Sequence, residues 1–127
     1  MIVTSKANSI LNDLFKNGYY IGLSTTTPTA SGSNISEPLA KNGYKRVKLT
    51  CIGEADSAKI QNTDIIFFPE STGDWGTITH FFVCSSEAST PHYWGELTPA
   101  GGVAIPEGYV PIFRAGALKI GLDRDAL

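Results

Sequence analysis

The sequence of 127 residues has few charged side chains, and those it has are nearly balanced in sign. Asp, Glu, Lys and Arg make up 17% of the chain, against roughly 25% in an ordinary globular protein, and the formal net charge is -2. A nucleic-acid groove needs clustered Lys and Arg to displace counterions, so we expect no nucleic-acid partner. The densest basic run, Lys41 to Lys48, would be divided between two faces by strand alternation. A weakly charged surface rich in Ser, Thr, Asn and Gly suits a subunit that packs against neighbours.

Long apolar runs and cysteines are also scarce. No stretch approaches the roughly 18 apolar residues of a membrane span, so we expect no membrane partner. The N-terminus lacks the basic and apolar segments of a signal peptide, which predicts a protein made in a cytoplasm. The two cysteines, Cys51 and Cys84, lack metal-ligand spacing. Buried free thiols are favoured over a disulfide, although the sequence leaves their redox state open.

Catalytic signatures are missing as well. The sequence contains neither a Gly-x-Ser-x-Gly elbow nor a Gly-Lys-Ser/Thr phosphate loop, and its carboxylates are scattered. Asp123 and Asp125 lack the remaining ligands of a calcium loop and are interpreted as a solvated terminus. We therefore predict no enzyme, no catalytic residue, no cofactor and no metal site. A small glycosidase that uses Glu96 stays an alternative.

The sequence does contain one amphipathic helix followed by short strands. A helix is predicted over residues 5–17, with Ser5 as its N-cap and Asn17-Gly18 at its end. Residues 26–43 are polar and predict a long surface loop. Strands are predicted over residues 19–25, 44–52, 64–68, 76–85, 92–98, 108–113 and 117–123. The pattern predicts a single, mainly β domain over residues 1–127, an antiparallel β-sandwich or jelly roll with one short N-terminal helix.

One candidate structural site is the turn Asp74-Trp75-Gly76. Its carboxylate is expected to accept backbone N–H bonds, its indole to anchor the two sheets, and Gly76 to relax the chain into the next strand. His80 alternates with apolar neighbours on either side, so it is interpreted as a core or interface histidine rather than a metal ligand. All four residues are candidates for subunit contacts.

A second candidate site lies in the aromatic segment that starts at His92. By alternation, His92 shares a face with Trp94 and Glu96, a set that could hold a sugar or a metal. Tyr93, Trp94 and Glu96 are therefore possible glycan-binding residues. Core and subunit contacts are the other interpretation of these rings, and the one we favour.

Two motifs carry a family resemblance. They are Phe68 to Phe81, which contains Asp-Trp-Gly-Thr-Ile-Thr-His, and Tyr93-Trp94-Gly95-Glu96-Leu97-Thr98. Both resemble a family of small virion proteins of tailed bacteriophages and prophages, variously labelled tail fibre, head fibre or hypothetical structural proteins. The similarity continues through Tyr20 to Thr29, Gly43 to Val47 and Ala115 to Asp123, and so covers most of the chain.

The resemblance implies an accessory structural protein of the virion, made in the host bacterial cytoplasm. Decoration of the capsid is favoured over a tail or fibre role, because a long fibre normally shows repeats or heptads and this chain shows neither. The expected partners are further copies of the chain, as a trimer, and other virion proteins such as the major capsid protein or tail proteins. A carbohydrate-binding module that recognises a cell-surface glycan is the alternative.

Overall fold

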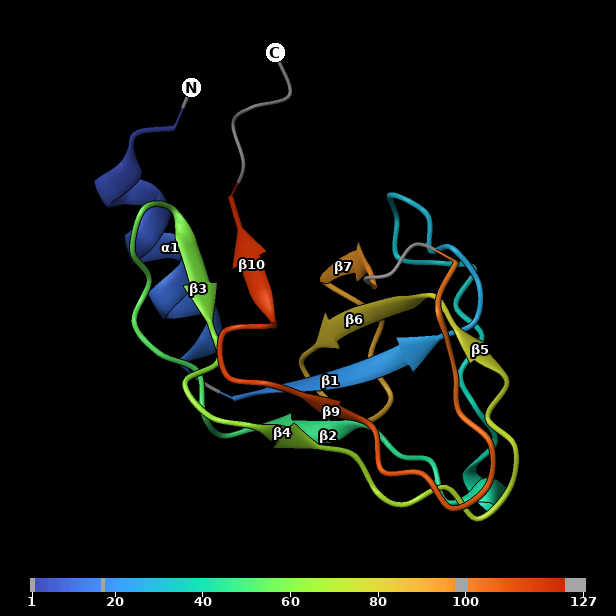
Figure 1. Ribbon diagram of the computed structural model, residues 1–127. Coiled ribbons are helices and arrows are strands. Elements are labelled where there is room, and N and C mark those ends of the chain that lie inside the picture. The colour runs from blue at the N-terminus through green and yellow to red at the C-terminus, as the bar shows by residue number, and fades with distance from the viewer. Residues whose placement is uncertain (1, 17, 98–100, 123–127) are drawn as a thin grey trace. The chain divides into compact units, whose positions relative to one another are not determined.

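The computed structural model describes residues 2–16, 18–97 and 101–122 (Figure 1). The chain divides into two compact units. Unit 1 contains Met1–Gly18, Leu49–Ile66 and Ile112–Leu127, and unit 2 contains Tyr19–Lys48 and Phe67–Pro111. One helix accompanies short antiparallel strands, which confirms the mainly β class with an N-terminal helix. The jelly-roll arrangement and the single domain stay predictions.

The helix α1 (Thr4–Phe15) opens unit 1. Ala7 and Leu11 are its buried residues. Of the apolar stripe in the sequence, Ile10, Leu11, Leu14 and Phe15, only Leu11 is buried, and Ile10 exposes 38% of its surface. The predicted N-cap is wrong, because the carbonyl of Val3 already accepts the first helical bond from Ala7 at 3.0 Å. Ser5 therefore lies within the first turn. Gly18 follows the helix with φ of 82°, the left-handed conformation expected of it, whereas Asn17 lies outside the described residues.

The rest of unit 1 is built around two short strands. β3 (Lys59–Gln61) pairs antiparallel with β10 (Lys119–Gly121), which buries Ile60 against Ile120. The sequence did not predict β3, because a single apolar residue between polar neighbours carries no alternation signal. Asn8 and Asn12 of α1 each accept a backbone N–H bond at 2.8 Å from the segment before β3. Unit 1 also contains β9 (Ile112–Phe113), the end of the strand predicted over 108–113.

A four-stranded antiparallel sheet in the order β2-β1-β6-β7 belongs to unit 2 at every residue except Leu49, the last residue of β2 (Figure 1). These strands span Val47–Leu49, Tyr19–Ser24, His80–Cys84 and Tyr93–Glu96. The central strand β6 is buried at every position. The ring of Phe82 lies over Gly22, its register partner on β1, and the ring of Phe81 lies over Gly95 on β7. Each glycine therefore leaves room for an aromatic ring on the sheet.

The predicted strand over residues 76–85 is divided in two. β5 (Thr77–Ile78) pairs with β8 (Val103–Ala104), whereas β6 starts after the break at Thr79. At this break, the N–H of Thr79 bonds to the carbonyl of Ser24, and the carbonyl of Thr79 accepts the N–H of Leu97. β4 (Ile66–Phe67) is shorter than the predicted strand over 64–68.

The connection over residues 26–43 is largely exposed, as predicted for a surface loop, but it is well tied down. Pro28, Gly32 and Pro38 are buried, and the short 3-10 helix η1 (Ala40–Asn42) lies near its end. Ser24, fully buried, accepts N–H bonds from Thr26 and Ser36 at 3.1 Å each. A single hydroxyl thus satisfies two backbone N–H groups of the loop.

Candidate functional site

The turn Asp74-Trp75-Gly76 is held by its own side chains. Asp74 Oδ1 accepts the N–H of Gly76 at 2.9 Å, and Gly76 has φ of 80°, which a residue with a Cβ rarely adopts. The buried indole of Trp75 donates to the carbonyl of Asn42 at 2.7 Å and lies edge-on to Tyr44. The indole therefore anchors η1 to this turn.

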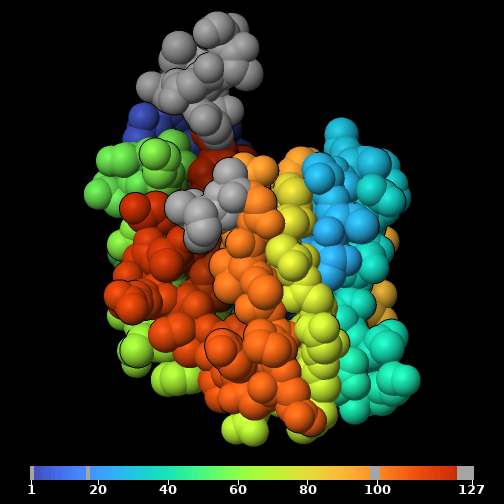
Figure 2. Space-filling model, turned by 45° about the vertical axis from the view of Figure 1, so that its right-hand side comes forward, coloured from blue at the N-terminus to red at the C-terminus, as the bar shows by residue number. Residues whose placement is uncertain are grey.

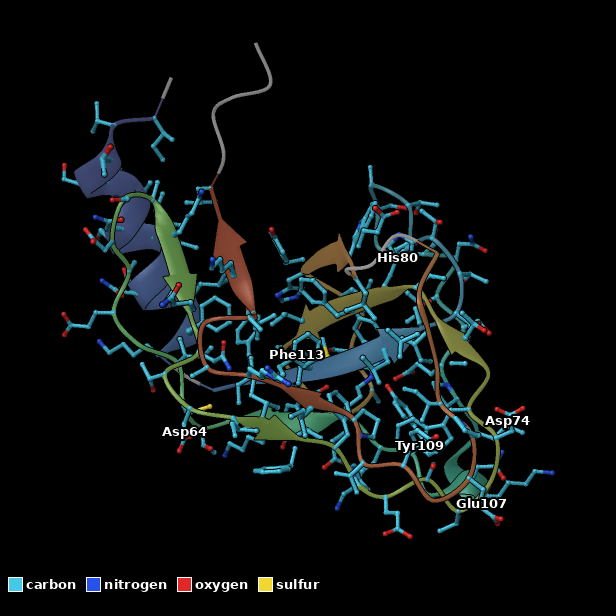
Figure 3. The ribbon with its side chains drawn as sticks, in the orientation of Figure 1. Asp64, Asp74, His80, Glu107, Tyr109 and Phe113 are labelled. Atoms are coloured by element: carbon cyan, nitrogen blue, oxygen red, sulfur yellow. The ribbon has the colours of Figure 1, made fainter. Side chains whose placement is uncertain are left out.

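His80 lies apart from that turn. Figure 3 shows this by its labels for His80 and for Asp74, the first residue of the turn. The imidazole is buried in β6, with Nδ1 2.8 Å from the hydroxyl of Thr79 and the ring edge-on to Trp94 at 5.6 Å. It is therefore a hydrogen-bonded core histidine in a strand that is buried at every position. Across the described residues no three His, Cys, Asp or Glu side chains gather in a way that could hold a metal ion.

The predicted glycan residues on β7 lie on two faces of the sheet. Tyr93 pairs with Val83 and its ring lies beside Phe81, whereas Trp94 pairs with Phe82. The Trp94 indole donates to the carbonyl of Thr29 at 3.0 Å, so its polar edge is already used within the protein. Glu96 is exposed and lies opposite His80. The two rings thus form no common stacking platform, and glycan binding at this strand stays a prediction.

A buried charged group is the main feature that the sequence did not predict. In the strand predicted over residues 44–52, Tyr44 and Arg46 would alternate with Val47 and Leu49 and lie on the face opposite to these apolar residues. That arrangement is wrong for a strand with one buried face, since Tyr44 and Arg46 are both buried. Strand β2 starts only at Val47, so the alternation rule does not apply to the residues before it. Arg46 and Glu37 form an ion pair, with Nε to Oε1 at 2.9 Å and Nη2 to Oε2 at 3.1 Å.

The Arg46 cluster, defined as Glu37, Tyr44, Arg46 and Cys84, joins two loops to the sheet. Arg46 Nη1 donates to the carbonyls of Ser86 and Ser89 at 3.2 and 2.8 Å and to the Cys84 sulfur at 3.2 Å.

The rest of the cluster surrounds this guanidinium, which lies 4.8 Å from the centroid of the Phe82 ring. The hydroxyl of Tyr44 donates to Glu37 at 2.6 Å, and burial together with this bond raises the pKa of Tyr44. Burial also raises the pKa of the Cys84 thiol. Cys84 is thus the buried free thiol that was expected, whereas Cys51, also free, is half-exposed.

An exposed apolar segment lies on the surface of unit 2. We call residues 103–110 the Tyr109 segment; it runs within the orange surface of Figure 2. Val103, Tyr109 and Val110 expose 42%, 57% and 47% of their surface. Figure 3 labels Tyr109 together with Glu107, which is also exposed.

The segment is fixed by Ser71, whose buried hydroxyl donates to the carbonyl of Pro106 and accepts the N–H of Tyr109 at 3.0 Å. The backbone of Ser71 bonds to Gly108 and Tyr109 as well. The apolar side chains are therefore presented on a backbone that is already ordered, which lowers the entropy cost of docking.

Comparison with known proteins agrees with the expected role as a structural protein of a phage particle. No described helix has the length and apolar character to cross a membrane. No curated protein matches the chain. A protein family described as "Podophage GP4 fiber I protein gp80" matches residues 2–121, which is nearly the whole sequence. The chain therefore belongs to the Podophage GP4 fiber I protein gp80 family, a family of structural proteins of the phage particle.

Proposed function

We propose that the chain is a non-enzymatic subunit of a phage fibre, which docks on a neighbouring fibre subunit through the Tyr109 segment. The family match carries this proposal, because its description names a fibre protein and it extends over residues 2–121. It favours a fibre over the capsid surface, the location that the sequence pattern favoured. Capsid decoration, through contact with the major capsid protein, becomes an outcome of the experiment below.

The physical argument for docking rests on three exposed apolar side chains within eight residues. Val103, Tyr109 and Val110 would be costly to leave in water, since burial of apolar surface contributes about 25 cal/mol per Å². Tyrosine is also enriched at protein interfaces, where its ring packs and its hydroxyl finds a polar partner. A trimer is the symmetric assembly that we propose, because fibre subunits must close around an axis.

The proposal is tested by incorporation into particles. Phage particles assembled with a Tyr109→Ser, Val110→Ser double variant should lose most of the protein, whereas Val3→Ser, which also alters an exposed valine, should leave incorporation unchanged. Thermal unfolding of the purified variants verifies that both still fold. Gold labelling of wild-type particles should mark the fibres. Label distributed over the capsid, or normal incorporation of the double variant, would contradict the proposal.

A further inference from the structure

The basic run Lys41 to Lys48 contributes to an open pocket within unit 2. The pocket has a volume of about 490 Å³ and is lined in part by Lys45, Arg46, Lys48, Phe67 and Glu87. This volume lies within the roughly 300 to 1,000 Å³ typical of small-ligand sites. Three of the ten Lys and Arg residues of an acidic chain therefore gather at one cavity.

Both lysines line this cavity because they do not belong to one regular strand. In a continuous strand, residues 45 and 48 would point to opposite faces. β2 begins at Val47, and residues 44–46 before it have no strand hydrogen bonding, so Lys45 is free of that constraint. The division of the basic run expected from alternation is therefore wrong for this pair.

The two lysines supply the available charge of the pocket. Arg46 forms its ion pair with Glu37 and donates to the carbonyls of Ser86 and Ser89. These bonds hold the loop over residues 86–89, which carries Glu87. Lys45 and Lys48 are exposed, and among the described residues neither has a carboxylate within ion-pair distance. Among the described residues that line the pocket, Glu87 is the one carboxylate, so the free charge is positive on balance.

An aromatic ring beside these lysines narrows the class of ligand. Phe67 on β4 exposes 60% of its surface, whereas its neighbour Ile66 is buried. An exposed ring offers a flat apolar face, which matches the C–H face of a pyranose. Two free ammonium groups suit one carboxylate, but they are too few to neutralise the phosphates that a nucleic-acid strand would bring.

We propose that this pocket binds an acidic saccharide of the uronic acid type, with its carboxylate at Lys45 and Lys48 and a ring face against Phe67. The site is separate from the predicted glycan residues on β7. It does not depend on the fibre assignment, since it rests on the pocket alone.

The experiment titrates the purified chain with tetragalacturonate and follows binding by calorimetry. The expected result is measurable binding at low salt that weakens at high salt. The Lys45→Gln, Lys48→Gln double variant should bind at least about tenfold more weakly, because each charged hydrogen bond contributes to affinity. Phe67→Ala should also weaken binding. Lys41→Gln removes a charge from the same run outside the pocket and should bind as the wild type does.

Two further probes separate the saccharide from other occupants. A neutral galactose tetramer should bind much more weakly than the acidic one, and tetraglutamate should bind weakly because it has no pyranose face for Phe67. No binding of tetragalacturonate at millimolar concentration would overturn the proposal. Equal losses for the double variant and for Lys41→Gln would do so too, as would tetraglutamate binding as tightly as the sugar.

Discussion

Replacing Arg46 by Met should destabilise unit 2 more than any other removal of a charge. The methionine keeps much of the apolar stem but removes hydrogen bonds to Glu37, Ser86 and Ser89. A buried ion pair that loses one partner typically costs about 3 to 5 kcal/mol. The Glu37 side chain keeps 26% of its exposure, so water compensates part of the loss, and we expect about 3 kcal/mol.

The assay is urea unfolding followed by tryptophan fluorescence. Both tryptophans, Trp75 and Trp94, lie in unit 2 with Arg46, so the signal reports on the unit that contains the substitution. Lys45→Met is the matched control, because it removes an exposed charge from the adjacent residue and should change stability by less than about 0.5 kcal/mol. All variants are compared at one protein concentration.

A double-mutant cycle with Glu37→Gln identifies the cause. The amide keeps the shape of Glu37 but removes its charge, so the coupling with Arg46→Met should reach about 1 to 3 kcal/mol. A loss for Arg46→Met no larger than that for Lys45→Met would refute the reasoning. A coupling near zero would show that Arg46 acts through its bonds to Ser86 and Ser89 or its contact with Phe82, and not through Glu37.

Three further predictions follow from close contacts. Gly22→Ala should lower the free energy of unfolding by about 2 kcal/mol, because the new Cβ would collide with the Phe82 ring. Gly121→Ala, whose Cβ would meet a lysine side chain at 3.3 Å, should lower it by less, and urea unfolding of both variants measures the difference. Ser71→Ala leaves the carbonyl of Pro106 and the N–H of Tyr109 without the Ser71 hydroxyl, so hydrogen exchange at the Tyr109 amide should accelerate and stability should fall by about 1 kcal/mol. With Ellman's reagent near pH 8, the half-exposed Cys51 should react in the native protein, whereas Cys84 should react only after unfolding. Burial raises the pKa of the Cys84 thiol and so keeps it protonated; rapid reaction of both thiols would contradict this.

Much of the local structure could be predicted from the sequence, because it depends on nearby residues. The apolar stripe around Leu11 predicts α1, and the run of β-formers ending at Cys84 predicts β6. The carboxylate of Asp74 and the glycine two residues later predict their own turn. These features need no information about distant parts of the chain.

The Arg46 cluster could not be predicted, because its partners are distant in sequence. Glu37 lies nine residues before Arg46, and the carbonyls of Ser86 and Ser89 lie 40 and 43 residues after it. The alternation rule also assumed a strand that begins at Tyr44, whereas hydrogen bonding of β2 starts only at Val47. The same late start brings Lys45 and Lys48 to one pocket, which alternation had excluded.

The small number of charged residues was first attributed to a surface that packs against neighbouring subunits. The protein interior supplies a second reason. Strands of two to six residues leave many backbone groups without ladder partners, and such groups must be satisfied when buried. Ser24, Asn62 and Ser71 supply these bonds as fully buried neutral side chains. Among the described residues, no buried side-chain nitrogen or oxygen lacks a partner. Short neutral polar residues stabilise this fold because each can be buried without the desolvation cost of an ion. Arg46 does carry that cost, and its burial therefore requires a full set of hydrogen-bond acceptors.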